Sequence, residues 1–126
     1  MRAIVDDALP GPFGPYSHIV IDGGLAYTAG FGPHTPEGTP LTPSGQAHAA
    51  LDNLEAALAS AGCGLADLVK LTVLVDDLAV MLPAVDAELA ARVPAPHPVR
   101  TVLQAALPGG VPVVLDAVAR IPAVGG

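Results

Sequence analysis

The C-terminal segment Val111–Arg120 places the strongest constraint on the fold, because it is predicted to be a strand that is apolar on both faces. One face carries Val113, Leu115 and Ala117, and the other carries Val114 and Val118. A strand of this composition has to be covered from both sides, since neither set of side chains is suited to water. The segment therefore predicts a sheet with a packed layer on each face.

The other predicted strands are short and are separated by turn-forming residues. They span Arg2–Val5, His18–Asp22, Ala26–Gly30, Leu65–Val75 and Val99–Ala106. The Gly23-Gly24 pair predicts a hairpin between the second and the third strand. Residues 8–16 and 31–43 are rich in Pro and Gly and are predicted to be loops. One face of the fourth strand is expected to carry Val69, Leu71, Val73 and Val75.

Two helices are predicted from the spacing of apolar residues. The first spans Ser44–Ala61, where five apolar residues recur three or four positions apart. Thr42 or Ser44 is expected to cap its start, and Gly62 to end it in the left-handed conformation. The second runs from about Leu82 to Val93, with Pro83 in the first turn, where proline is tolerated. The apolar stripe of the first helix consists of Ala47, Leu51, Leu54, Leu58 and Ala61.

This order of elements predicts an α+β fold in which two helices cover one face of a sheet. Other subunits are the expected cover for the second face. The composition agrees, because 52% of the residues are hydrophobic and only 13% are charged, about half the charged fraction of an average soluble domain. We therefore expect a homo-oligomer. The alternative interpretation is an Ala- and Pro-rich composition that reflects genome bias.

Charge and length exclude several classes of protein. The net charge of −7, from 12 acidic and 5 basic residues, argues against nucleic-acid binding, which needs clustered Lys and Arg. The length of 126 residues fits one domain. Asp6 and Asp7 stand where a signal peptide would be apolar, and no apolar run approaches the ~20 residues of a membrane span. These features predict a cytoplasmic protein that binds neither nucleic acid nor membrane.

No motif for a metal or a cofactor is found. The histidines are far apart, and no two have the i,i+4 spacing of a helical metal site. Cys63 is the single cysteine, which excludes an intrachain disulfide. Its position in a turn flanked by glycines favours a small buried side chain over a nucleophile. We expect no metal and no cofactor.

Arg100 is the residue that most suggests chemistry. It lies inside the predicted strand Val99–Ala106, on the same face as Val102 and Gln104. A guanidinium in such a place needs an anion or several carbonyl acceptors, because it stays charged. One interpretation is a structural ion pair with one of the many acids. The other is two-point binding of the carboxylate of a small substrate.

Several segments in a fixed order carry a recognisable set of motifs. They are Gly14-Pro15-Tyr16-Ser17-His18, residues 24–30 (GLAYTAG), Gln46 with residues 50–54 (ALDNL), Ala61-Gly62, residues 67–73 (DLVKLTV), residues 98–101 (PVRT), Leu107-Pro108 and residues 117–119 (AVA). Together they resemble the RidA (YjgF) family over nearly the whole chain. The resemblance implies a single RidA-like domain over residues 1–126, with a chorismate-mutase-like fold. It also implies a homotrimer with a central barrel and three pockets, each lined by two subunits.

The resemblance further implies an activity. Many members hydrolyse reactive enamines and imines, released by pyridoxal-phosphate dehydratases, to 2-oxo acids and ammonia without a cofactor. Arg100 is then expected to be the catalytic residue that holds the substrate carboxylate. Tyr16 is expected to line the pocket, and backbone groups near Gly30 and around Ala106-Leu107 to orient the substrate or water. Other members are labelled ribonucleases or translation inhibitors, and the negative charge argues against that role here.

This sequence departs from the family at several pocket positions. Ala29 and Phe31 replace the usual Ser and Gln, Val85 replaces an Asn of the second helix, and Val114 replaces an acid that orients water. Asp116, two residues further along the same strand face, is a possible replacement for that acid. The apolar positions favour a bulkier, more apolar 2-imino acid. The open alternatives are a non-hydrolytic enzyme of a specialised biosynthetic pathway and a non-catalytic binder of small carboxylates.

Overall fold

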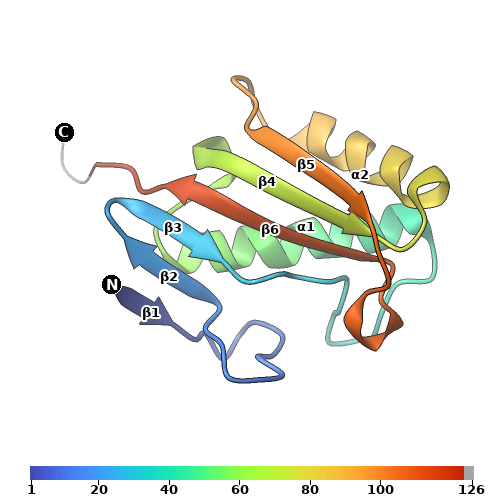
Figure 1. Ribbon diagram of the computed structural model, residues 1–126, viewed down its shortest axis with the longest axis horizontal. Coiled ribbons are helices and arrows are strands. Elements are labelled where there is room, and N and C mark those ends of the chain that lie inside the picture. The colour runs from blue at the N-terminus through green and yellow to red at the C-terminus, as the bar shows by residue number, and fades with distance from the viewer. Residues whose placement is uncertain (124–126) are drawn as a thin grey trace.

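The computed structural model describes residues 1–123 and contains one six-stranded sheet with two helices on one face (Figure 1). In the sheet the order is β1-β2-β3-β6-β4-β5, with β4 and β5 parallel and the other neighbours antiparallel. This confirms the predicted α+β class with two helices and a mixed sheet. The strands are β1 (Arg2–Ile4), β2 (Ile19–Asp22), β3 (Leu25–Thr28), β4 (Leu68–Val75), β5 (Val99–Gln104) and β6 (Val113–Arg120), and the helices are α1 (Pro43–Ser60) and α2 (Leu78–Arg92).

The hairpin between β2 and β3 forms at the predicted glycine pair. Gly23 and Gly24 have φ angles of 60° and 78°, in the region that a side chain disfavours. Two consecutive positive φ angles are the requirement of the tight turn that matches the twist of antiparallel strands. Asp22 and Leu25 consequently face each other as the first pair of the hairpin.

Helix α1 is the element that the sequence predicts best. The Thr42 side chain accepts a hydrogen bond from the Gly45 N–H, so the expected cap is present. Gly62 follows the helix with a φ angle of 77°, as predicted. Leu54 and Leu58 are completely buried, and α1 packs against β6 and β3. The apolar stripe therefore becomes the helix side of the core.

Helix α2 begins at Leu78, four residues before the predicted start at Leu82. The Asp77 side chain caps it by accepting a hydrogen bond from the Val80 N–H. Pro83 thus lies inside the helix and not in its first turn, which corrects the prediction. The apolar spacing suggested a later start because Leu78 and Val80 are exposed and add nothing to a buried stripe. Within residues 1–123, neither helix is long and apolar enough to cross a membrane.

A β-bulge near the start of β4 corrects the predicted side-chain pattern of that strand. Leu71, Val73 and Val75 are buried as predicted, whereas Val69 is 46% exposed. The pairing of β4 with β6 shifts its register between Leu68 and Lys70. The extra residue turns Val69 outward, so that Leu68 fills the buried position instead.

All six observed strands are shorter than predicted, and β3, β5 and β6 show the physical reason. β3 ends at Thr28 and not at Gly30, β5 ends at Gln104 and not at Ala106, and β6 begins at Val113 and not at Val111. In each case the residues next to the paired part of the strand are also apolar or small. Hydrophobicity therefore overestimates the length of these strands.

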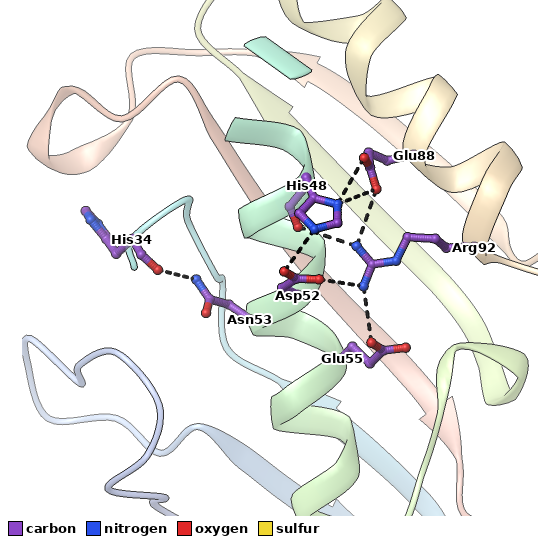
Figure 2. A network of polar contacts seen from close by, with 7 residues as sticks. All are labelled: His34, His48, Asp52, Asn53, Glu55, Glu88 and Arg92. Carbon is purple, nitrogen blue, oxygen red and sulfur yellow. Dashed lines mark hydrogen bonds and ion pairs between the residues drawn. The ribbon is translucent and has the colours of Figure 1, made fainter. Parts of the chain in front are cut away.

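A network of charged side chains joins the outer faces of α1 and α2 (Figure 2). The Arg92 guanidinium contacts Asp52 at 2.8 Å, Glu55 at 3.1 Å and Glu88 at 3.3 Å. His48 bridges Asp52 and Glu88. Burial lowers the pKa of Arg92, but the Glu88 hydrogen bond and the nearby Asp52 and Glu55 raise it by more. Arg92 thus stays charged and links the two helices.

The face of the sheet opposite the helices is partly open. Tyr27, Val99 and Leu103 on this side are 43%, 67% and 54% exposed. Val114 and Val118 of β6 are only partly covered, whereas Val113 and Leu115, on the helix side, are buried. One face of the apolar β6 strand therefore lacks the packed layer that its sequence predicts.

Candidate functional site

Two cavities lie on opposite sides of the sheet. The larger, of about 690 Å³, lies on the open face, where the loop before β2, the segment after β3 and the segment before β6 converge. The smaller, of about 340 Å³, lies between α2 and β5. Leu74 lines the larger cavity and Leu71 the smaller one. Because these residues are three positions apart on β4, their side chains point to opposite faces.

The N-terminal loop forms one wall of the larger cavity and is held by His18, which is 1% exposed. His18 Nδ1 accepts a hydrogen bond from the Asp6 N–H, and His18 Nε2 lies 2.9 Å from the Pro10 carbonyl oxygen. The neutral ring protonated on Nε2 satisfies both contacts. Tyr16, on the same loop, accepts a hydrogen bond from the Phe13 N–H at its hydroxyl oxygen. The ring of His18 therefore fixes the loop that places Tyr16 at the cavity.

Asn53 of α1 holds the loop on the opposite wall. Its Nδ2 donates hydrogen bonds to the carbonyl oxygens of Gly32, at 2.9 Å, and His34, at 2.8 Å. Figure 2 shows the contact with His34. Gly32 and His34 both line the larger cavity. The helix thus supports a loop that has no regular secondary structure of its own over most of its length.

The floor of the larger cavity is apolar and closely packed. Gly30 faces Val114, and a Cβ atom at Gly30 would lie only 2.6 Å from Val114 Cγ1. A side chain at Gly30 is therefore excluded unless the stiff valine moves. Phe31 is 3% exposed and pairs through its backbone with Leu115 of β6. Ala29 completes this part of the wall.

Asp116 is the one carboxylate that lines the larger cavity in the part of the chain that the structure describes. It lies on β6 opposite Thr72, on the same face as Val114. Within residues 1–123 it makes no ion pair, and its side chain has no hydrogen-bond partner in the protein. Arg120, on the same strand, does not pair with it. Its carboxylate is thus free to bind water.

Arg100 lies at the smaller cavity, on the helix side of the edge strand β5. It pairs with Leu71 in the parallel ladder, and paired residues share a face of the sheet. Its Nη1 donates to Oδ1 of Asp86, which projects from α2. The two side chains are 36% and 48% exposed, so this ion pair is accessible to small molecules. His97 also borders the cavity, and its other walls are mainly apolar.

The predicted site residues therefore divide between two places in one chain. The larger cavity is lined by Tyr16, Ala29, Gly30, Phe31, Leu107, Val114 and Asp116. Arg100 lines the smaller one, across the sheet. Val85 and Ala106 border neither cavity. Val85 is 1% exposed in the core, because the observed α2 directs it inward and places the next residue, Asp86, at the cavity.

The comparison with family models gives a match over residues 7–121, to the model described as Endoribonuclease L-PSP. This match covers almost the whole chain. The chain belongs to the RidA (YjgF) family.

Two curated relatives of the family come from Escherichia coli strain K12. The putative reactive intermediate deaminase TdcF is 33% identical over 81 residues, which are 62% of this chain and 63% of TdcF. The 2-iminobutanoate/2-iminopropanoate deaminase is 35% identical over 79 residues, 61% of this chain and 62% of the relative. The aligned region thus spans less than two thirds of the length of these relatives.

Solved structures of the RidA family share the fold over almost the full chain. RidA from the Antarctic bacterium Psychrobacter superposes with a TM-score of 0.89 at 29% identity, covering 96% of this chain and 100% of that one. Escherichia coli TdcF with bound serine superposes with a TM-score of 0.83 at 29% identity, covering 95% of this chain and 98% of that one. The arrangement of strands and helices is therefore that of the RidA family.

Sequence reasoning missed three residues that shape the two cavities. Asp86 was not singled out because one carboxylate among 12 acidic residues carries no local signal. His18 and Asn53 belong to the RidA-like motifs, but their roles depend on contacts 12 and 21 residues away in sequence. The sequence offers no local signal for these contacts, because α1 carries several other polar residues and His18 lies outside the strands.

Cys63 has the inert environment that its sequence context suggests. It is 7% exposed, and its Sγ lies 3.6 Å from the Arg120 carbonyl oxygen. Burial, followed by the nearby Asp67, raises the pKa of the Cys63 thiol. The thiolate needed for nucleophilic attack is disfavoured. Within residues 1–123, no three His, Cys, Asp or Glu side chains are grouped so that they could hold a metal ion.

Proposed function

We propose that this RidA-family protein hydrolyses reactive 2-imino acids and their enamine tautomers to 2-oxo acids and ammonia, without a cofactor, with Arg100 binding the substrate carboxylate. The observation that carries the proposal is the place of Arg100. Among residues 1–123, it is the one Lys or Arg that borders either cavity. The names of the relatives support the reaction class.

The reaction requires that the substrate is bound, that its C=N bond is polarised and that a water molecule is delivered to the C=N carbon. Water adds to the C=N carbon, and the resulting carbinolamine expels ammonia to leave the C=O group. A guanidinium that holds the adjacent carboxylate fixes the position of the C=N carbon, which lowers the entropic part of the barrier. Asp116 is proposed to orient the attacking water, because its carboxylate has no protein partner within residues 1–123.

A homotrimer is proposed to complete the site. The exposed Val99 and Leu103 lie on the edge strand β5, and burying them against a second copy removes apolar surface from water. In this arrangement the open sheet faces meet in a central barrel. The larger cavity of one protomer, with Tyr16 and Val114, then forms one pocket with Arg100 of the next protomer. Such a pocket unites the residues that a single chain keeps apart.

Light scattering coupled to size exclusion tests the assembly. We expect a particle with three times the mass of one chain at micromolar concentration, because the apolar face of the sheet needs cover. Replacing Leu103 with Asp places a charge on that face and is expected to shift the population toward monomer. Leu41→Asp, at an exposed loop residue, is the matched control, and the particle that this variant forms is expected to keep the wild-type mass. A wild-type monomer would contradict the trimer.

Ammonia and 2-oxo acid release test the activity itself. A pyridoxal-phosphate dehydratase acting on threonine supplies the unstable imine, and the rate of 2-oxobutanoate formation is followed with and without this protein. We expect faster formation in its presence, with one ammonia for each 2-oxo acid. A rate equal to that of the dehydratase alone contradicts the proposal. Consumption of the imine with a rearranged product, and no 2-oxo acid, indicates a non-hydrolytic reaction instead.

A further inference from the structure

The Arg100–Asp86 pair places a positive and a negative group side by side at the smaller cavity. Arg100 comes from β5 and Asp86 from α2, and both side chains line the cavity. The pair is 36% and 48% exposed, so it is neither sealed in the core nor fully hydrated. An ion pair this exposed contributes little to stability. Its location at a cavity therefore calls for an explanation other than support of the fold.

The contact between the two groups leaves most of their hydrogen-bonding capacity unused. Only Nη1 of Arg100 and Oδ1 of Asp86 meet. Within residues 1–123, Nη2 and Nε of Arg100 have no further acceptor, and Oδ2 of Asp86 has no further donor. A guanidinium has five donors and a carboxylate about four acceptor positions. A ligand can therefore contact both members without separating them.

The charge at this place selects the class of ligand. Among residues 1–123, His97 is the one other ionisable side chain on the cavity, and Leu89, Ala90 and Val93 make an apolar wall. Arg100 and Asp86 cancel in net charge, so a simple anion is attracted by one group and repelled by the other. A zwitterion with a carboxylate next to a cationic nitrogen is complementary to both. Protonated 2-imino acids and 2-amino acids with short aliphatic side chains have this form.

We infer that Asp86 is a specificity-determining residue that selects ligands carrying a cationic nitrogen beside the carboxylate held by Arg100. The inference rests on the proposed function for the identity of the substrate. In that reaction a protonated imine and water give a 2-oxo acid and an ammonium ion, so the organic molecule loses its positive charge on the nitrogen. Asp86 then attracts the substrate and repels the product, which favours release of the 2-oxo acid.

Calorimetric titration with two matched ligands tests the inference. 2-Aminobutanoate carries the ammonium group, whereas 2-oxobutanoate has the same carbon skeleton without it. We expect the wild-type protein to bind the amino acid about fivefold more tightly than the oxo acid, as for a partly exposed charge contact. Asp86→Asn keeps the side-chain shape and removes the charge. We expect the preference to vanish in this variant and 2-oxobutanoate to bind more tightly.

Two further variants separate a binding role from a structural one. Asp22→Asn removes the same charge from the exposed end of β2, away from both cavities, and is expected to keep the wild-type preference. Asp86→Glu restores the charge and is expected to recover the preference at least in part. An unchanged ratio of affinities in Asp86→Asn overturns the inference, as does a wild-type protein that does not prefer 2-aminobutanoate. A preference that depends on Asp86, without imine hydrolysis, refutes only the proposed function.

Discussion

Replacing Arg100 with alanine is expected to lower kcat/KM for imine hydrolysis by about 10²–10³-fold. The guanidinium supplies two charge-assisted hydrogen bonds to the substrate carboxylate, and each is worth about 1.5–3 kcal/mol before screening by solvent. Each 1.36 kcal/mol of lost transition-state binding corresponds to about a tenfold loss in rate. Arg100 is 36% exposed, and solvent screens its charge, so each hydrogen bond is expected to contribute near the lower end of its energy range. The dehydratase-coupled assay measures the loss.

Arg120→Ala is the matched control for this prediction. Arg120 also lies on a strand, is exposed, and borders neither cavity. Its replacement changes the net charge by the same amount and is expected to leave kcat/KM within twofold, as surface charges away from a site contribute little. Arg100→Lys retains the charge without the planar fork and is expected to lie between wild type and alanine. Equal activity of Arg100→Ala and wild type would remove Arg100 from the mechanism.

Leu54→Ala is expected to lower the free energy of unfolding by about 2–5 kcal/mol, the range for removing a large aliphatic side chain from a packed core. Leu54 is completely buried where α1 covers the sheet. Its loss leaves a cavity that a rigid helix cannot close. Urea denaturation followed by circular dichroism measures the change, at one protein concentration because association adds to apparent stability.

The exposed loop residue Leu41 provides the control for the stability measurement. It is the same residue type and is 96% exposed. Leu41→Ala is expected to change the free energy of unfolding by no more than about 0.5 kcal/mol. A loss at Leu54 no greater than that at Leu41 would show that α1 does not seal the core as the structure indicates.

Local sequence signals predicted those parts of the fold that neighbouring residues control. The Thr42 cap, the Gly62 termination and the Gly23-Gly24 turn all depend on groups within a few residues of one another. Apolar spacing predicts a start of α2 that is four residues too late, because the Asp77 cap decides where the helix begins. The bulge beside Val69 has no local signal, since it arises from the pairing of β4 with β6.

The candidate site shows the same division. Tyr16, Gly30 and Val114, which the family resemblance assigns to the substrate pocket, line one cavity in the structure, and their role in binding stays a prediction. The environment of Arg100 was not predictable, since its partner Asp86 is 14 residues away on another element. Both interpretations of Arg100 considered at the outset are consistent with the geometry: it has an acidic partner, and it faces a cavity.

The sequence by itself determined the type and order of the main elements, the apolar stripe of α1 and the family, and it predicts the need for cover on both faces of β6. Those properties follow from the order of side chains along the chain and from local backbone preferences. Only the tertiary structure decided which charges meet: Asp86 with Arg100, and Arg92 with Asp52, Glu55 and Glu88. The physical reason is that electrostatic contacts depend on distances in space. The packing of the helices on the sheet sets these distances.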